Sequence, residues 1–136
     1  MASELRVNTL KDAAGANSVA TSTVANGSAK AWINFNGSTA TATADLTGVA
    51  DSFNIDSLVD NGTGDYTVTM TNSMNNADYS LAGLVGNGTG SFNRGISTGY
   101  GTAPTASAYT LSSIISSSGS LTDCSYVSSH VMGDLA

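Results

Sequence analysis

The stretch that decides the fold is SFNIDSLVDNGTGDYTVTMT, residues 52–71. Its two ends, residues 52–60 and 66–71, are rich in β-branched and aromatic side chains, which favour β-strands. Asn61-Gly62 begins the segment between them, and this dipeptide readily adopts the positive φ angles of a hairpin turn. We therefore predict an antiparallel hairpin. The side chains expected to face its core are Phe53, Ile55, Leu58 or Val59, Tyr66, Val68 and Met70.

Further strands are expected on both sides of this hairpin. Upstream, residues 30–37 (KAWINFNG) alternate with period two, which places Ile33 and Phe35 on one face and Trp32 on the other. Residues 39–44 (TATATA) alternate as well, and form either a thin second strand or an edge. The downstream strand candidates are YSLAGLVG (79–86), SAYTLSSIIS (107–116) and CSYVSSHVM (124–132), separated by loops at 86–100 and around Pro104.

About seven short strands with glycine-rich turns and no convincing helix indicate an all-β protein. We expect an antiparallel β-sandwich of jelly-roll type. Residues 29–136 are expected to form a single domain, because no charge block or composition break marks an internal linker. We expect one contiguous buried cluster of Trp32, Phe35, Phe53, Val68 and Met70, because the alternation places most of them on inward faces of paired strands.

Residues 1–28 differ from this domain in composition. Charged residues are frequent near the start, and residues 13–29 are mostly small. Leu5, Val7 and Leu10 give the segment an apolar side that water would penalise. We expect an extended N-terminal arm for assembly, which becomes ordered when it contacts a neighbouring subunit or another protein. The alternative is a frayed terminus without a role.

The net charge of −6 excludes some partners and favours others. An acidic chain repels phosphate backbones, so nucleic acid is not an expected partner. No apolar run approaches the roughly 20 residues of a membrane-spanning helix, and the first residues do not resemble a signal peptide. We therefore expect that the protein is made in a cytosol and does not insert into a membrane.

The composition also favours self-association. Ser, Thr, Asn and Gly make up close to half of the residues, and only 7% are aromatic, so the core has few large side chains. A domain of this size buries only about two-thirds of its unfolded surface. Cys124 is the only cysteine, so no disulfide within the chain adds stability. Oligomerisation would compensate for the thin core.

The sequence lacks the residue groups that catalysis requires. His130 is the only histidine available as a base, and even spacing places it on the strand face of Cys124 at about 20 Å, which excludes a dyad. The acidic residues all lie in polar contexts, which disfavours a glycosidase pair. Residues 60–65 carry oxygen ligands, but a hairpin turn is favoured over a calcium loop. We expect no enzyme activity, no metal and no cofactor.

Two further patterns have competing interpretations. Asn26, Asn36, Asn61 and Asn87 each begin a glycosylation pattern, but each also begins a turn signal, which is the favoured interpretation. Trp32 is a candidate for stacking on a sugar ring, because exposed aromatic side chains do this in glycan sites. Packing in the core or in an interface is the favoured role of this single tryptophan.

Five stretches carry a resemblance to known proteins. They are residues 4–12 (ELRVNTLKD), 30–37 (KAWINFNG), 51–68 (DSFNIDSLVDNGTGDYTV), 76–79 (NADY) and 130–134 (HVMGD), and together they span nearly the whole chain. The chain resembles a family of small modules in tail-fibre and other structural proteins of tailed phages, especially marine ones. Family members often have a basic residue just before the Ser-Phe-Asn motif, whereas Ala50 and Asp51 stand there in this chain.

The resemblance implies a virion component that is commonly trimeric and has no catalytic residues. We therefore expect a bacteriophage virion structural protein, located in the virion and assembled in the host cytoplasm. It would be a homotrimer that contacts other virion proteins, as a capsid decoration or knob protein or as a tail-fibre component. The alternative is a glycan-binding module on the virion that recognises a receptor on the host surface.

Overall fold

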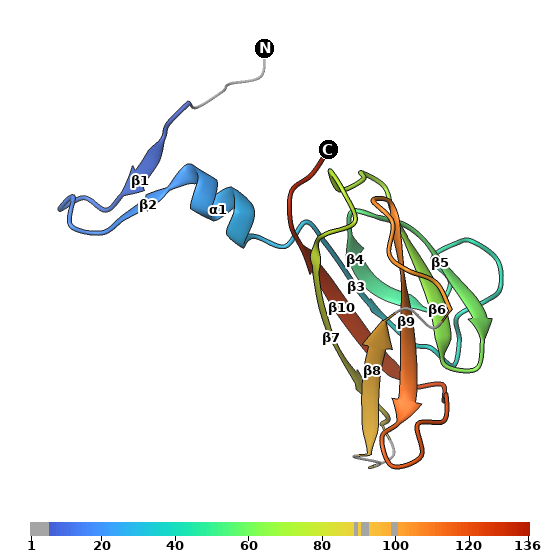
Figure 1. Cartoon of the computed structure of the whole chain (residues 1–136). Coiled ribbons are helices and arrows are strands. Elements are labelled where there is room, and N and C mark those ends of the chain that lie inside the picture. The colour runs from blue at the N-terminus through green and yellow to red at the C-terminus, as the bar shows by residue number, and fades with distance from the viewer. Residues whose placement is uncertain (1–5, 89, 91–92, 99–100) are drawn as a thin grey trace.

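The computed structural model describes residues 6–88, 90, 93–98 and 101–136. Within these residues, two antiparallel four-stranded sheets form a sandwich, and a thin arm extends from it (Figure 1). The first sheet has the strand order β4 (Val49–Phe53), β3 (Ala31–Phe35), β10 (Tyr126–Met132) and β7 (Ser80–Gly86). The second has the order β5 (Ile55–Gly62), β6 (Asp65–Met70), β9 (Ala108–Ile115) and β8 (Arg94–Thr98). The predicted all-β sandwich is confirmed.

The predicted hairpin is present as β5 and β6, which pair antiparallel. Gly62 and Gly64 adopt φ angles of 136° and 66°, the left-handed region that glycine enters without strain. A Cβ atom on Gly64 would lie 2.6 Å from the Ser113 carbonyl oxygen, so a larger residue does not fit there. The Gly64 N–H donates to Oδ1 of Asp123 at 2.7 Å. The turn is therefore tied to the segment that leads into β10.

The prediction that Phe53 faces the core is wrong. Asn54 separates β4 from β5 with a φ of 57°, and the chain passes there from the first sheet to the second. Phe53 thus ends a strand of the first sheet and is 55% exposed on its outer face. The alternation of side chains is broken at this crossing, which explains why a single register over residues 52–60 fails.

The core lies between the two sheets. Its buried hydrophobic side chains are Ala31, Ile33, Phe35, Ile55, Leu58, Tyr66, Val68, Met70, Met74, Tyr109, Leu111, Cys124, Val127 and Val131. The rings of Phe35 and Tyr66 meet edge to face with their centroids 5.0 Å apart, which joins the two sheets. Of the predicted cluster, Phe35, Val68 and Met70 are confirmed as core residues. Trp32 is half-buried and lies on the outer face instead.

Residues 39–44 were predicted to form a thin second strand or an edge, but they form a loop. The loop begins with a turn in which Oδ1 of Asn36 accepts from the Ser38 N–H at 3.0 Å. It then crosses the edge of β5: the Asp60 N–H donates to the Thr41 carbonyl at 2.7 Å, and Leu58 N–H to the Asp45 carbonyl at 2.7 Å. The loop therefore covers the free edge of the predicted hairpin.

Three other features differ from the sequence expectations. Strand β8 lies within the predicted loop at 86–100, and the arm contains a short helix where no helix was expected. The jelly-roll strand order is not confirmed. The pairs β3/β4, β5/β6 and β8/β9 are neighbours both in sequence and within one sheet, so these consecutive strands do not alternate between the sheets.

Candidate functional site

The N-terminal arm is a small hairpin followed by one short helix. Strands β1 (Thr9–Lys11) and β2 (Ser18–Ala20) pair antiparallel, and α1 (Thr21–Gly27) follows β2 directly. The register places Leu10 opposite Val19, so both side chains lie on one face of the hairpin. Val7 and Leu10, which the sequence assigned to assembly, lie in this arm; Leu5 lies outside the described residues.

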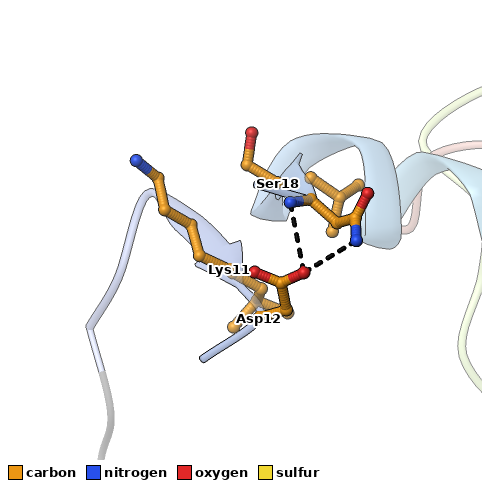
Figure 2. Close-up of a pocket in the computed structure, with 6 residues that line it drawn as sticks. Lys11, Asp12 and Ser18 are labelled. Carbon is orange, nitrogen blue, oxygen red and sulfur yellow. Dashed lines mark hydrogen bonds between the residues drawn. The ribbon is translucent and has the colours of Figure 1, made fainter. Parts of the chain in front are cut away.

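The turn of this arm is held by Asp12. Its carboxylate accepts from the backbone N–H of Ala16 at 3.0 Å. It also accepts from the backbone N–H of Asn17 at 3.3 Å and from the Asn17 side-chain amide at 2.7 Å (Figure 2). The hydrogen bond from the Asn17 side chain is the main cause that lowers the pKa of Asp12 below its ordinary value of 3.8. Gly15 supplies a φ of 70° in the same turn. The local sequence therefore specifies the hairpin.

The arm exposes its apolar side chains. Val7, Leu10, Val19 and Val24 are 39%, 45%, 37% and 45% exposed, and residues 6–20 and 22–29 are all exposed. A shallow depression of about 300 Å³ on the hairpin is lined by Leu10, Val19 and the residues of the Asp12 turn (Figure 2). A two-stranded hairpin and a seven-residue helix are each marginal in water without a partner. The arm thus has the surface of a segment that docks on another molecule.

The joint between the arm and the sandwich is fixed by hydrogen bonds. The Lys30 N–H donates to the Val131 carbonyl at 2.8 Å, and the Lys30 carbonyl accepts from the side-chain amide of Asn54 at 3.0 Å. The Lys30 ammonium donates back to the Ala25 carbonyl at the end of α1 and to Oγ of Ser28 at 2.9 Å. The helix is therefore linked to the first core strand through one residue.

A second surface of interest is the outer face of the first sheet. In the register, Trp32 lies between Phe53 on β4 and His130 on β10, and His130 lies next to Ala82 on β7. We call Phe53, Trp32 and His130 the aromatic row. Phe53 and His130 are exposed and Trp32 is half-buried. Trp32 is therefore placed outside the core of the sandwich, where a ligand can reach it.

The polar neighbours of this row lie two residues further along each strand. On the same face, Asn34 pairs with Asp51 on one side and with Ser128 on the other. Their side chains offer one carboxylate, one amide and one hydroxyl beside the aromatic rings. This combination of ring faces and hydrogen-bonding groups can bind a flat molecule that has hydroxyl groups.

Sequence reasoning missed several of these surface residues. Val19 and Val24 in the arm were not selected, although the Asp12 and Gly15 turn signal in the sequence would have paired Leu10 with Val19. Phe53 was assigned to the core. No local signal assigned His130 to the row, because its neighbours come from distant parts of the chain.

The structure separates the residues considered for catalysis. Cys124 is fully buried and precedes β10, whereas His130 is exposed on the outer face, so the expectation that they share a strand face is wrong. Among the described residues, no group of three or more His, Cys, Asp or Glu side chains is placed to hold a metal ion. In the segment 60–65, Asp60 accepts from the Gly62 N–H at 2.8 Å within the turn.

A buried polar contact near the hairpin turn belongs to the scaffold. The Tyr66 hydroxyl donates to Oδ1 of Asp123 at 3.0 Å, the atom that also accepts from Gly64. Burial raises the pKa of Tyr66 well above its ordinary range, and the Asp123 carboxylate adds to this effect. The hydroxyl therefore stays protonated and serves as a structural donor.

The described residues include no helix with the length and apolar character needed to span a membrane. No protein-family model, no curated protein and no solved structure matches this chain.

Proposed function

We propose that this protein is a self-assembling structural component of a tailed-phage virion, a homotrimer that serves as a capsid decoration or knob protein or as part of the tail fibre. The observation that supports self-assembly is the arm, whose described part exposes Val7, Leu10, Val19 and Val24 and extends away from the sandwich (Figure 1). The virion assignment and the number three rest on the resemblance of residues 4–12, 30–37 and 51–68 to phage structural modules.

The charge distribution supports the arm as the contact segment. In residues 1–28, Glu4 and Asp12 balance Arg6 and Lys11, so the whole net charge of −6 is carried by residues 29–136. Two acidic sandwiches repel each other, whereas a neutral arm approaches an acidic sandwich without this cost. In a trimer with cyclic symmetry, each arm would contact the next subunit and the ring would close after three steps.

Light scattering on the purified chain tests self-assembly. We expect a trimer mass at micromolar concentration for the full chain, and a smaller mass for a chain that begins at residue 29. A full-length monomer would contradict the proposal. The virion assignment is tested separately by cryo-EM of intact phage particles, in which the sandwich should be found on the capsid or on the tail.

A second candidate function is recognition of a glycan on the host surface, which is compatible with a place in the virion. The aromatic row favours it, because Trp32 and Phe53 are accessible beside Asn34 and Asp51. Aromatic faces stack on sugar rings while polar neighbours bind the hydroxyl groups.

The single tryptophan makes this candidate testable by fluorescence. A glycan that binds at the row should change the emission of Trp32, and Phe53→Ala should weaken that change. Tyr126→Ala is the matched control, because Tyr126 is also exposed on the outer face of this sheet, four residues from His130 on β10. Unchanged emission across a glycan library would exclude this role for the row.

A further inference from the structure

One side of the sandwich contains an open groove. Strands β7 and β8 are edge strands of the two sheets, and they lie next to each other on this side (Figure 1). A groove of about 390 Å³ lies between them, and its apolar side chains include Leu81, Ile96 and Leu111. Leu81 and Ile96 pack against the core but are only partly buried. A partner that fills the groove would complete the burial of these side chains.

The other side of the sandwich is already closed. There β4 continues into β5 through Asn54, and the loop at 36–48 donates to and accepts from the backbone of β5. Strands β7 and β8 have no such cover among the described residues. Edge strands with free backbone groups pair readily with another chain. The groove is therefore the side of the sandwich that is prepared for a partner.

We propose that this groove binds the N-terminal arm of a second copy of the chain, with Leu10 and Val19 inserted between β7 and β8. This inference rests on the proposed self-assembly and names the surface that receives the arm. Leu10 and Val19 form an apolar pair on one face of the hairpin, and the groove offers apolar side chains of matching character. The residues that line the groove carry no charge, so they suit the neutral arm.

The position of the arm explains why a second copy, rather than the same chain, is the partner. Ala31, the first residue after the arm in β3, pairs with Val131, and Val131 pairs with the groove residue Leu81. The arm therefore joins the sheet at the level of the groove. Two strand spacings, about 10 Å, separate that exit from the groove. However, the arm extends away from its own sandwich (Figure 1), and hydrogen bonds from Lys30 to Ala25 and Ser28 link α1 to its joint with the sheet.

A pair of matched arm variants tests the role of Leu10 in the full chain. Leu10 and Val24 are both 45% exposed, so neither Leu10→Asp nor Val24→Asp disturbs the core. Leu10→Asp should raise the dissociation constant of the oligomer by at least about tenfold, because it removes a buried leucine from the interface. Val24→Asp should leave it within about twofold. Equal effects of the two variants, or no effect of Leu10→Asp, would overturn the proposal.

Disulfide cross-linking identifies the surface that receives the arm. Thr98 lines the groove and pairs with the inward-facing Leu111, so its side chain points toward the groove. Asp56 is exposed on β5, which lies at the opposite edge of the same sheet. Full chains with Leu10→Cys are mixed with full chains with Thr98→Cys and oxidised, and the control mixture uses Asp56→Cys. The native Cys124 is buried and should not react.

We expect a covalent dimer from the Thr98→Cys mixture and little from the Asp56→Cys mixture. Oligomers without this cross-link would overturn the proposed groove while self-assembly stands. A disulfide within one chain that carries both Leu10→Cys and Thr98→Cys, with none in the mixture, would show that the arm binds its own sandwich and would overturn the inference. A full-length monomer in light scattering would instead contradict the proposed function itself.

Discussion

Asn54 shows how one residue can determine the path of the chain. It adopts a φ of 57°, which few residues other than glycine accept, and its side chain compensates with hydrogen bonds. Its amide donates to the carbonyls of Lys30 and Asn72 at 3.0 Å each, and its Oδ1 accepts from the Asn72 N–H at 2.7 Å. The crossing between the sheets and the base of the arm therefore share one side chain.

We predict that Asn54→Ala destabilises the sandwich by about 2–4 kcal/mol, since it adds backbone strain and removes three hydrogen bonds to backbone groups. Asn54→Gly should cost about 1–3 kcal/mol, because glycine relieves the strain but restores no hydrogen bond. Urea unfolding measures both values, with Asp56→Ala at an exposed position as the control. Equal stability of Asn54→Ala and the original chain would contradict this role.

The ionisation of Asp65 should make the stability of the fold depend on pH. Burial, assisted by the nearby Asp60, raises the pKa of Asp65 above its ordinary value of 3.8, and its Oδ1 has no hydrogen-bond partner. A raised folded-state pKa gives stability that is present below the unfolded pKa and is lost as the pH rises through the folded value. At neutral pH the ionised carboxylate therefore destabilises the fold. Asp65→Asn should raise the Tm at neutral pH.

Below the unfolded pKa of Asp65, both forms are neutral and the advantage of Asp65→Asn should disappear. Calorimetry at neutral pH and well below pH 3.8 compares the two chains. Asp56→Asn is the control for a general charge effect, because Asp56 is exposed. An equal gain in Tm at both pH values would indicate a cause other than ionisation.

At the scale of strands, the two phenylalanines of neighbouring strands β3 and β4 give opposite expectations. Phe35 is 1% exposed, and Phe35→Ala should cost about 3–5 kcal/mol, as for other large core truncations. Phe53 is 55% exposed, so Phe53→Ala should change stability by only about 0.5 kcal/mol. Urea midpoints with unchanged slopes measure the difference. Similar losses of stability in both variants would indicate that Phe53 faces the core after all.

This pair of residues also shows what a sequence pattern can and cannot predict. Hairpin β5/β6 and strand β3 were predictable, because alternation and an Asn-Gly turn are local signals. The crossing at Asn54 was not, since its positive φ depends on partners at Lys30 and Asn72 that are distant in sequence. Strand β8 is a short edge strand with a glycine at its second position, so its local signal is weak.

The candidate surfaces were predictable to different degrees. Val7 and Leu10 were recognisable because apolar side chains stand out in a polar arm. The aromatic row was predictable only in part. Alternation placed Trp32 on the other face of the strand from Ile33 and Phe35, but Phe53 and His130 lie beside Trp32 only because of the strand pairing. The groove between β7 and β8 depends on the order of strands in both sheets, which no local pattern specifies.

At the scale of the whole molecule, core and arm have separate roles. The sandwich contains every buried hydrophobic residue of the described chain, and its first strand begins at Ala31, after the arm ends. The arm contributes exposed apolar surface and no net charge. We therefore expect the sandwich to supply the folding stability, and we propose that the arm supplies the contacts of assembly.

This division predicts how removal of the arm affects stability. A chain that begins at residue 29 keeps the hydrogen bonds of Lys30 to Val131 and Asn54, so its monomer should be as stable as the full-length monomer within about 0.5 kcal/mol. The proposed self-assembly would add stability to the full chain by mass action. The Tm of the full chain should therefore rise when protein concentration increases about tenfold, whereas that of the shortened chain should not. Calorimetry at both concentrations measures this, and a shortened chain that is less stable by more than about 1 kcal/mol in dilute solution would show that the arm packs on its own sandwich.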